Sequence, residues 1–429
     1  MADRIAVISG ARTPIAKAQG ALREHAADDL GAFALKEAVA RAEIDPAEYG
    51  EVVFGSVAQP FDTPNIARAI ALKAGLAAET PAYTVQRNCA SGVEAVRAAS
   101  ARLRSGEITA AIAGGTESMS NIPLLFGGEY ARFWAEHKAA KSRRARLRSI
   151  IRFRPRFLRP EHGTRKLLTD STTGMLMGHT AERLAREFRI SRAEQDEYAR
   201  ESHRRATAAT SAGVFRLETA VVPIPPRYAE MLGLDQGPRS STTPAQFAAL
   251  KPSFNTYTGT VTAANSSALS DGAAALVLMR ERDAKERGIE PLGFLRAHAV
   301  AALDPARMGL GPAYATARLL DQTGTELNDF ELIELNEAFA AVVLANERAF
   351  ASEQFAGTEL GRSRALGAID RDRLNVNGGA IALGHPLAMS GVRLILHLLY
   401  ELRRREKNAG LATLCVGGGE GAAVMVEVA

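Results

Sequence analysis

Short apolar runs alternate with helical patterns over the first 120 residues of the chain. Ile5–Ile8 and Val52–Val57 are runs rich in β-branched residues between turn formers, which is typical of buried strands. Asp28–Ala42 and Ala90–Arg104 repeat Leu, Val and Ala at helical spacing. Ile108–Ala113 leads into two glycines and predicts another buried strand. Strand–helix alternation of this kind predicts an α/β fold with a mainly parallel sheet.

The pattern changes between about 121 and 250 and then resumes. That stretch carries a basic segment, several prolines and helical patterns but no strong series of strands. We therefore interpret it as an inserted loop domain that lies over a scaffold. The alternation that follows predicts three strands and two helices: Leu276–Met279, Leu332–Leu335, Leu411–Val416, Ala338–Phe350 and Val392–Arg405. We predict an N-terminal half over residues 1–280, which contains the insertion, and a C-terminal half over 281–429.

A faint internal repeat links the two ends of the chain. Ala90–Val96 resembles Met389–Ile395, and each segment is followed by a helix and by a strand that ends at paired glycines. The order and the spacing of these features recur together, as expected of a duplicated half. The repeat favours two homologous halves.

Length and charge exclude several classes of protein. A chain of 429 residues exceeds what one hydrophobic core usually supports, and no apolar run approaches the roughly 20 residues that span a bilayer. The N-terminus shows no targeting segment, so we expect a cytoplasmic protein. The net charge of +5 is local, because twelve Lys and Arg but one acid lie between Lys138 and Lys166. Binding of nucleic acid by the whole protein is therefore not expected.

Cys89 and Cys415 are the two cysteines of the sequence. Two thiols exclude a disulfide scaffold and a four-thiolate metal site, and we expect no metal. Cys89 follows a strand-like run, Ala82–Gln86, and precedes a helix, so it should lie at a helix N-terminus. There the helix dipole and free backbone N–H groups lower the pKa of a thiol and can hold an oxyanion. Cys89 is therefore a candidate nucleophile.

Three further motifs carry groups suited to acyl transfer. His385 lies between a glycine and a proline just before a helix, where it can act as a base toward Cys89. Cys415 ends a buried strand before a run of glycines, and a second thiol can shuttle protons in carbon–carbon bond chemistry. Asn336 follows a strand, and we expect it to cap the next helix and also to fix a water. The alternative for His385 is a turn histidine bonded to the backbone. The alternative for each cysteine is a buried residue with a structural role only.

These motifs, in this order, resemble the thiolase family from end to end. The sequence reads NCASG around Cys89, NEAFA around Asn336, GGAIALGHP around His385 and CVGGGEG around Cys415. Supporting matches lie at 12–14, 113–119, 177–182 and 260–267. The resemblance implies the thiolase fold, in which two homologous βαβαβαββ halves form an αβαβα layered sandwich with a loop domain inserted in the first half.

The resemblance also implies a role for each motif. Cys89 would be acylated, His385 would activate it, and Cys415 would exchange a proton with the α-carbon of the acetyl-CoA unit. Asn336 would hold a water that forms one oxyanion hole with His385. The backbone N–H groups of Cys89 and Gly417 would form the other oxyanion hole.

The implied substrates are 3-oxoacyl-CoA, acetyl-CoA and coenzyme A. Ser267 and Met177 match positions near the pantetheine arm of coenzyme A, and no permanently bound cofactor is implied. The expected reaction is thiolytic cleavage of 3-oxoacyl-CoA to acetyl-CoA and a shortened acyl-CoA in fatty-acid β-oxidation. The alternative is the biosynthetic condensation of two acetyl-CoA to acetoacetyl-CoA.

The basic segment 143–160 interleaves Arg with Ile, Phe and Leu. This segment has four interpretations. It can be a solvated helical face, it can contact an anionic membrane, it can dock a partner subunit, or it can attract the phosphates of coenzyme A. With 250–252 and 311–316 it resembles the thiolase β-subunit of trifunctional β-oxidation complexes, which implies a hydratase/dehydrogenase α-subunit as partner. Those β-subunits usually carry His where Asn336 stands, and this departure favours the biosynthetic type. The family resemblance also implies a homodimer or tetramer.

Two other functions are alternatives to that of a thiolase. A decarboxylating condensing enzyme of the same fold usually lacks the second cysteine, so Cys415 argues against it. A non-catalytic thiolase-like protein for lipid binding or assembly would have lost Cys89, His385 or Cys415, and all three are present. We therefore expect an enzyme, an acyltransferase.

Overall fold

A computed structural model that describes residues 4–428 shows a mixed α/β fold in which one order of elements occurs twice. The first series is β1 (Ile5–Arg12), α1 (Ala27–Ala42), β3 (Tyr49–Gly55), α2 (Ile66–Lys73), β4 (Ala82–Val85), α3 (Ser91–Ser105), β5 (Ala110–Ser118) and β10 (Ser270–Arg280). The second series is β11 (Gly293–Ala302), α11 (Gly311–Thr323), β12 (Leu332–Leu335), α12 (Ala340–Ala351), α15 (Leu387–Arg404), β13 (Ala409–Val416) and β14 (Glu420–Glu427). The predicted α/β class is confirmed, but the prediction of a mainly parallel sheet is wrong. Among the strands of the described residues, β3 pairs parallel with β4 and β5, β12 pairs parallel with β13, and the other pairs of the large sheet are antiparallel.

These strands form one ten-stranded sheet in the order β12-β13-β14-β11-β1-β10-β5-β3-β4, with β2 (Ala16–Lys17) paired to β10. Antiparallel pairing of β1 with β11 joins two arms. In each arm the next two strands outward are antiparallel, β10 and β5 in one and β14 and β13 in the other. The next strand outward is parallel to its neighbour: β3 follows β5 in the first arm, and β12 follows β13 in the second. Beyond it lies β4 in one arm and an isolated parallel bridge at Leu374 in the other. The arms share one topology, which confirms the two homologous halves.

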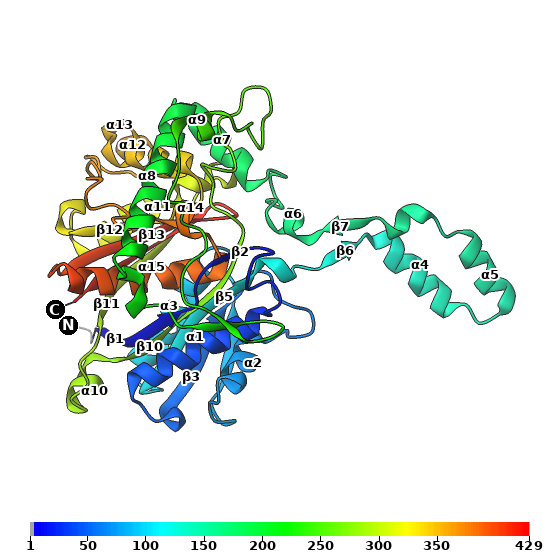
Figure 1. Cartoon of the computed structure of the whole chain (residues 1–429), viewed down its shortest axis with the longest axis horizontal. Helices are drawn as coiled ribbons and strands as arrows, with labels where there is room; N and C mark the ends of the chain where they lie inside the picture. The colour runs from blue at the N-terminus through cyan, green and yellow to red at the C-terminus, as the bar shows by residue number, and fades with distance from the viewer. Residues whose placement is uncertain (1–3, 429) are drawn as a thin grey trace. The chain divides into compact units, whose positions relative to one another are not determined.

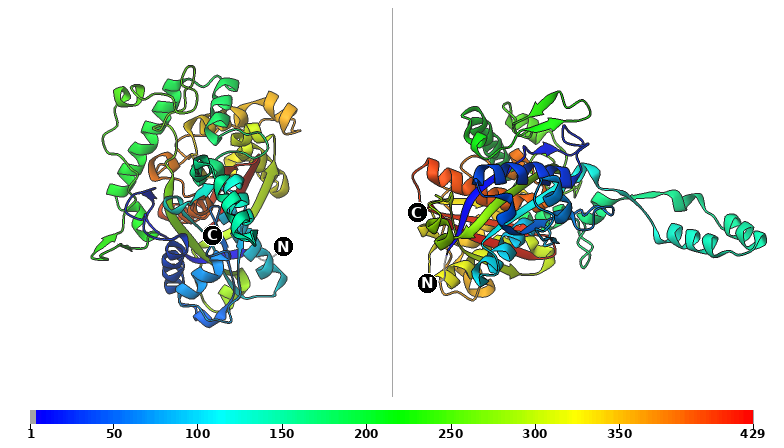
Figure 2. Two further views of the ribbon diagram at one scale, coloured as in Figure 1. Left: turned by 90° about the vertical axis from the view of Figure 1, so that its right-hand side faces the viewer. Right: turned by 90° about the horizontal axis from the view of Figure 1, so that it is seen from below.

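Helices cover the sheet in layers (Figure 1). α1 packs on β1, β5 and β10, and α11 packs on β11, β13 and β14. α3 and α15 pack against each other, and α15 contacts strands of both arms. Figure 2 shows α1 lying along the strands of its arm. Because helices cover both faces, every residue of β1, β5 and β10 is buried, which explains their continuous apolar runs.

Residues 122–169 form a compact unit of their own. Within it β6 (Leu124–Phe126) pairs antiparallel with β7 (Pro160–His162), and between them lie α4 (Gly128–Ala139) and α5 (Arg143–Ile151). The ring of Phe133 lies 5.1 Å from that of Phe153 and 6.4 Å from that of Phe157, centroid to centroid. This small aromatic cluster leaves large apolar side chains of the basic segment exposed: Leu147, Ile150, Ile151 and Leu158.

The remainder of the predicted insertion carries two long helices, α7 (Met177–Glu187) and α8 (Arg192–Ser211). The shorter elements are β8 (Val222–Ile224), β9 (Glu230–Leu232) and α9 (Pro244–Ala248), whereas α6 (Gly163–Leu167) belongs to the unit 122–169. Among residues 4–428, no helix is both long enough and apolar enough to cross a bilayer.

Arg12, at the end of β1, is fully buried between two carboxylates. Its Nε donates to Glu218 at 2.7 Å, and its Nη atoms donate to Asp235 at 2.7 and 2.8 Å. Arg12→Met would leave the buried Asp235 without its cation, so the free energy of unfolding is expected to fall by about 3–5 kcal/mol. The control is Arg287→Met, whose partly exposed pair with Glu48 should contribute under about 1 kcal/mol. Urea unfolding measures both variants, and equal losses of unfolding free energy in the two would contradict the prediction.

Candidate active site

Cys89 lies in a tight turn between β4 and α3. The N–H of Ala90 donates to the carbonyl of Arg87 at 2.9 Å, and the N–H of Ser91 donates to that of Asn88 at 2.9 Å. Asn88 has a φ of 42°, in the left-handed region. Ala90 is the N-cap residue of α3, so Cys89 directly precedes the helix, as its sequence predicts. The turn presents the thiol next to the free N–H groups of the first helical turn.

His385 and Asn336 are both buried and lie next to each other. Nδ2 of Asn336 lies 3.5 Å from Nε2 of His385, and Nδ1 of His385 lies 2.6 Å from Oγ of Ser390. The Ser390 hydroxyl donates to the carbonyl of Pro386 at 3.3 Å, so it accepts from Nδ1–H and leaves Nε2 unprotonated. Burial, with a smaller contribution from Arg393, lowers the pKa of His385 to about 4. At neutral pH the imidazole is therefore uncharged, with Nε2 ready to accept a proton.

Asn336 does not cap the following helix, and that expectation is wrong. The N-cap residue of α12 is Phe339. Asn336 directly follows β12, and its backbone N–H still bonds to the carbonyl of Thr413 in β13 at 2.9 Å, so the residue lies too early to cap α12. Its Oδ1 is buried and has no hydrogen-bond partner among the described residues. An unpaired buried acceptor is a place where a bound water can donate a hydrogen bond.

Two glycines, Gly92 in α3 and Gly115 in β5, let the start of α15 approach closely. A Cβ at Gly92, in the first turn of α3, would lie 2.4 Å from the carbonyl oxygen of Ala388, in the first turn of α15. A Cβ at Gly115 would lie 2.1 Å from the same oxygen. Only glycine permits so close an approach. The contact therefore places the start of α15, just after His385, against the start of α3, just after Cys89.

Cys415 and Gly417 meet Cys89 from the end of β13. The backbone of Gly417 lies close enough to the Cys89 sulfur to lower the pKa of that thiol by hydrogen bonding, and the neighbouring Cys89 raises the pKa of Cys415. Cys415 is buried. The structure therefore brings together two cysteines that are far apart in the sequence, along with the backbone donor that the resemblance implied.

The surroundings of Cys89 raise its pKa to about 11. Desolvation by burial is the main cause, and the hydrogen bond with Gly417 opposes it only in part. The expectation of a lowered pKa for Cys89 is therefore wrong, because desolvation outweighs the backbone hydrogen bonds that lower it. Burial also raises the pKa of Cys415. Both thiols are protonated at neutral pH, so Cys89 needs a base at the moment of attack.

Alkylation of Cys89 by iodoacetamide is expected to rise about tenfold per pH unit between about pH 6 and 9. The thiolate is the reacting form, and its fraction grows in this way below the raised pKa of about 11. Mass spectrometry of the peptide that contains Cys89 measures the rate, with Cys415→Ser as the control that removes the other thiol. A plateau across this range, as a thiolate–imidazolium pair gives, would contradict the prediction.

Met177 lies beside Gly417, and Ser267 lies beside Ala338. The Sδ of Met177 lies 3.3 Å from the position that a Cβ on Gly417 would take. The hydroxyl of Ser267 donates to the carbonyl of Ala338, within the NEAFA segment, at 3.0 Å. Within residues 4–428, no three His, Cys, Asp or Glu side chains are placed to hold a metal ion.

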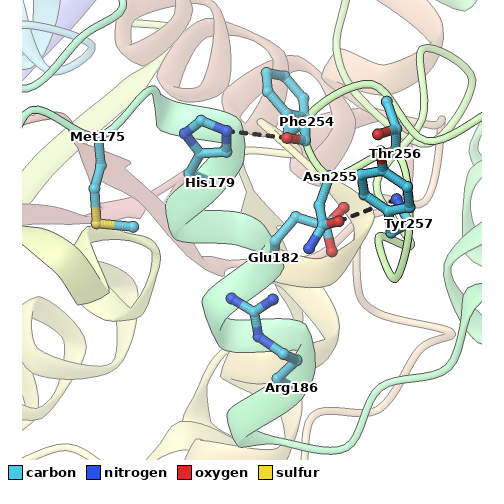
Figure 3. Close-up of a pocket in the computed structure, with 8 residues that line it drawn as sticks. All are labelled: Met175, His179, Glu182, Arg186, Phe254, Asn255, Thr256 and Tyr257. Atoms are coloured by element: carbon cyan, nitrogen blue, oxygen red, sulfur yellow. Dashed lines mark hydrogen bonds between the residues drawn. The ribbon is translucent and has the colours of Figure 1, made fainter.

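A pocket of about 460 Å³ beside α7 is a feature that the sequence interpretation missed. Figure 3 shows His179 and Glu182 on α7 facing the loop 254–257, with Arg186 one turn further along the helix at the edge of the pocket. Nε2 of His179 lies 3.1 Å from the carbonyl of Phe254, and Glu182 accepts the backbone N–H of Thr260 at 2.9 and 3.0 Å. The spacing of the three α7 residues, which puts them along one face of a helix, was the available signal.

Comparison with protein families and curated relatives agrees along the whole chain. The model of the thiolase N-terminal domain matches residues 5–282, and that of the thiolase C-terminal domain matches 289–428. The chain is 44% identical to the 3-ketoacyl-CoA thiolase of Serratia proteamaculans, over 99% of this chain and 97% of that protein. It is 43% identical to the 3-ketoacyl-CoA thiolase of Escherichia coli, over 100% and 97% of the two chains.

Solved structures agree as well. The acetyl-CoA acetyltransferase of Bacillus anthracis is 35% identical, with a TM-score of 0.87 over 99% of this chain and 98% of that one. Human mitochondrial 3-ketoacyl-CoA thiolase in complex with CoA is 33% identical, with a TM-score of 0.85 and the same coverage. With both domain models matched and relatives aligned from end to end, the chain belongs to the thiolase family.

Proposed function

We propose that the chain is a 3-ketoacyl-CoA thiolase. It would cleave 3-oxoacyl-CoA with coenzyme A to acetyl-CoA and an acyl-CoA two carbons shorter, through an acyl group on Cys89. The observation that carries the proposal is the meeting of the Cys89 thiol, the backbone of Gly417 and a second thiol, Cys415. Relatives at 43–44% identity over the whole chain carry this name, so the condensation of two acetyl-CoA is not favoured.

The first half of the reaction acylates Cys89. Nε2 of His385 takes the thiol proton as the sulfur attacks the 3-keto carbon. The backbone N–H groups of Cys89 and Gly417 hold the resulting oxyanion. The C2–C3 bond then breaks, its electron pair forms the enolate of acetyl-CoA, and Cys415 gives a proton to C2. A water on Oδ1 of Asn336, with the protonated His385, stabilises the enolate oxygen.

The second half of the reaction discharges the acyl group to coenzyme A. Cys415 takes the thiol proton of coenzyme A, and the resulting thiolate attacks the thioester carbon. The bond to the Cys89 sulfur breaks, and His385 returns the proton to that sulfur. Both cysteines and His385 then stand in their starting protonation states.

Coenzyme A is a substrate in this scheme, and we propose no permanently bound cofactor. Met177 and Ser267 would line the path of the pantetheine arm, since Met177 lies against Gly417. The pocket beside α7 would take an outer part of the acyl-CoA. Its volume of about 460 Å³ is within the range of ligand sites.

We also propose partners and a location for the protein. It would be a homodimer or tetramer, because β4 ends the sheet with an edge that a second copy can cover. Its location would be the cytoplasm. Peripheral membrane contact would use 143–160, where exposed Leu147, Ile150 and Ile151 lie among arginines. A hydratase/dehydrogenase α-subunit would be a further partner.

Release of acetyl-CoA from 3-oxoacyl-CoAs of increasing chain length, with free coenzyme A, tests the proposed reaction. We expect cleavage of substrates longer than acetoacetyl-CoA and none by Cys89→Ala. Activity confined to acetoacetyl-CoA would favour the biosynthetic type. Absence of cleavage at every length would refute the proposed function.

A further inference from the structure

The side chain of Asn88 joins the two loops that meet at the Cys89 thiol. Its Nδ2 donates to the carbonyl oxygen of Gly417 at 2.7 Å, and its Oδ1 accepts from Nε2 of Gln86 at 3.3 Å. Asn88 lies between β4 and α3, whereas Gly417 lies between β13 and β14. The bond therefore connects the two halves of the fold next to the nucleophile.

The turn around the nucleophile is held without this amide. Oγ of Ser91 accepts the N–H of Arg87 at 2.9 Å and donates to the carbonyl of Asn88 at 2.7 Å. The left-handed φ of Asn88, 42°, is one that Asn tolerates better than most residues. Backbone and Ser91 thus shape the turn, and the Asn88 side chain is left to bond outside it.

Gly417 is the part of the site whose position depends most on contacts from outside its own loop. Its backbone lies close enough to the nucleophilic sulfur to lower the pKa of the thiol, and its carbonyl oxygen is bonded to the residue before Cys89, yet it opens a run of three glycines. Gly418 and Gly419 have φ values of 92° and 82°. Because glycine has no side chain, side-chain packing cannot hold this run in place. The carbonyl of Gly419 accepts the N–H of Leu303 at 2.8 Å, which anchors the far end. Asn88 anchors the near end.

An ion pair crosses between the same loops without touching Gly417. Nη1 of Arg87 donates to Glu420 at 2.7 Å, and its Nε donates to Glu94 at 2.9 Å. The pair is partly exposed, with Arg87 at 24% and Glu420 at 32%, so it adds little on its own. Glu420→Gln therefore serves as a matched control for any change made at Asn88.

We propose that Asn88 is a positioning residue, which holds the Gly417 N–H on the Cys89 sulfur through its bond to the Gly417 carbonyl. Once the sulfur is acylated, the same N–H faces the carbonyl oxygen on which negative charge develops. Asn88 touches no reacting atom and acts through Gly417. The kinetic part of this inference rests on the proposed function.

Two variants separate the amide from the shape of the turn. Asn88→Gly keeps the left-handed backbone without strain but removes the donor. Asn88→Asp keeps the shape but cannot donate to the carbonyl at neutral pH, and it is the second variant should Asn88→Gly fail to fold. In both we expect kcat per titrated Cys89 to fall about 10- to 100-fold, because a displacement on the order of 1 Å costs about that much. KM should stay within about threefold, and Glu420→Gln should match the wild type.

Alkylation of Cys89 gives a second readout that needs no turnover. Loosening the Gly417 hydrogen bond destabilises the thiolate, so iodoacetamide should react about tenfold more slowly with Asn88→Gly than with the wild type at pH 8. If the wild type cleaves no 3-oxoacyl-CoA, the proposed function fails, and this comparison still decides on Asn88. Values of kcat and of the alkylation rate that both stay within about twofold of the wild type would overturn the inference.

Discussion

Replacing Cys89 with Ala is expected to lower kcat by about 10⁴-fold or more, since the nucleophile of a covalent mechanism has no substitute nearby. Cys415 cannot take over, because it is buried and its pKa is raised by desolvation and by the neighbouring thiol. The initial rate of acetyl-CoA release, measured at saturating 3-oxoacyl-CoA and coenzyme A, gives the value.

The matched control for this variant is Cys415→Ala. It should also lose most of its turnover, about 10³-fold, because the enolate then lacks its proton donor. Cys89 in that variant should still react with iodoacetamide, whereas Cys89→Ala should show no alkylation at that peptide. Retention of more than about 1% of kcat by Cys89→Ala would contradict the covalent mechanism.

His385→Gln is expected to lower kcat by about 10³-fold at pH 7. A thiol with a pKa of about 11 has a thiolate fraction on the order of 10⁻⁴ at that pH, so the reaction depends on a base. His385, with its pKa lowered to about 4 by burial, is in the base form under these conditions. The residual kcat of the variant should rise about tenfold per pH unit, since hydroxide then replaces the missing base.

Ser390→Ala is the graded control for His385. It removes the oxygen that holds Nδ1 at 2.6 Å but leaves the base in place, so kcat should fall by only about tenfold. A pH-independent residual rate in His385→Gln, or losses of equal size in both variants, would argue that His385 has only a structural role.

Much of the scaffold could be predicted from the sequence, because buried strands of this fold are continuous apolar runs. Leu332–Leu335 coincides with β12. β11 was missed because it carries an Arg and a His and is only partly buried. α11 was missed because it begins with a glycine, Gly311. The reason for that glycine is visible only in the fold, where a Cβ at this position would lie 2.2 Å from the carbonyl of Glu420. The domain boundaries near 280 and between 121 and 250 stay predictions.

The candidate site was predicted in its residues but not in its electrostatics. Motifs identified Cys89 and His385, whereas the sign of the Cys89 pKa shift depends on burial, which no local pattern reports. Asn336 was expected to cap a helix, but its backbone N–H is still bonded to β13, three residues before the N-cap of α12. The bond from Asn88 to Gly417 joins residues 329 positions apart, so no sequence spacing could reveal it.

The most direct test of the account is to mix the protein with a 3-oxoacyl-CoA in the absence of free coenzyme A, quench, and map the mass of its peptides. The account predicts an acyl group two carbons shorter than the substrate chain on Cys89, with one acetyl-CoA released per acylated chain. Added coenzyme A should then discharge that group. An unmodified Cys89 alongside released acetyl-CoA, or an acyl group on Cys415 instead, would contradict it.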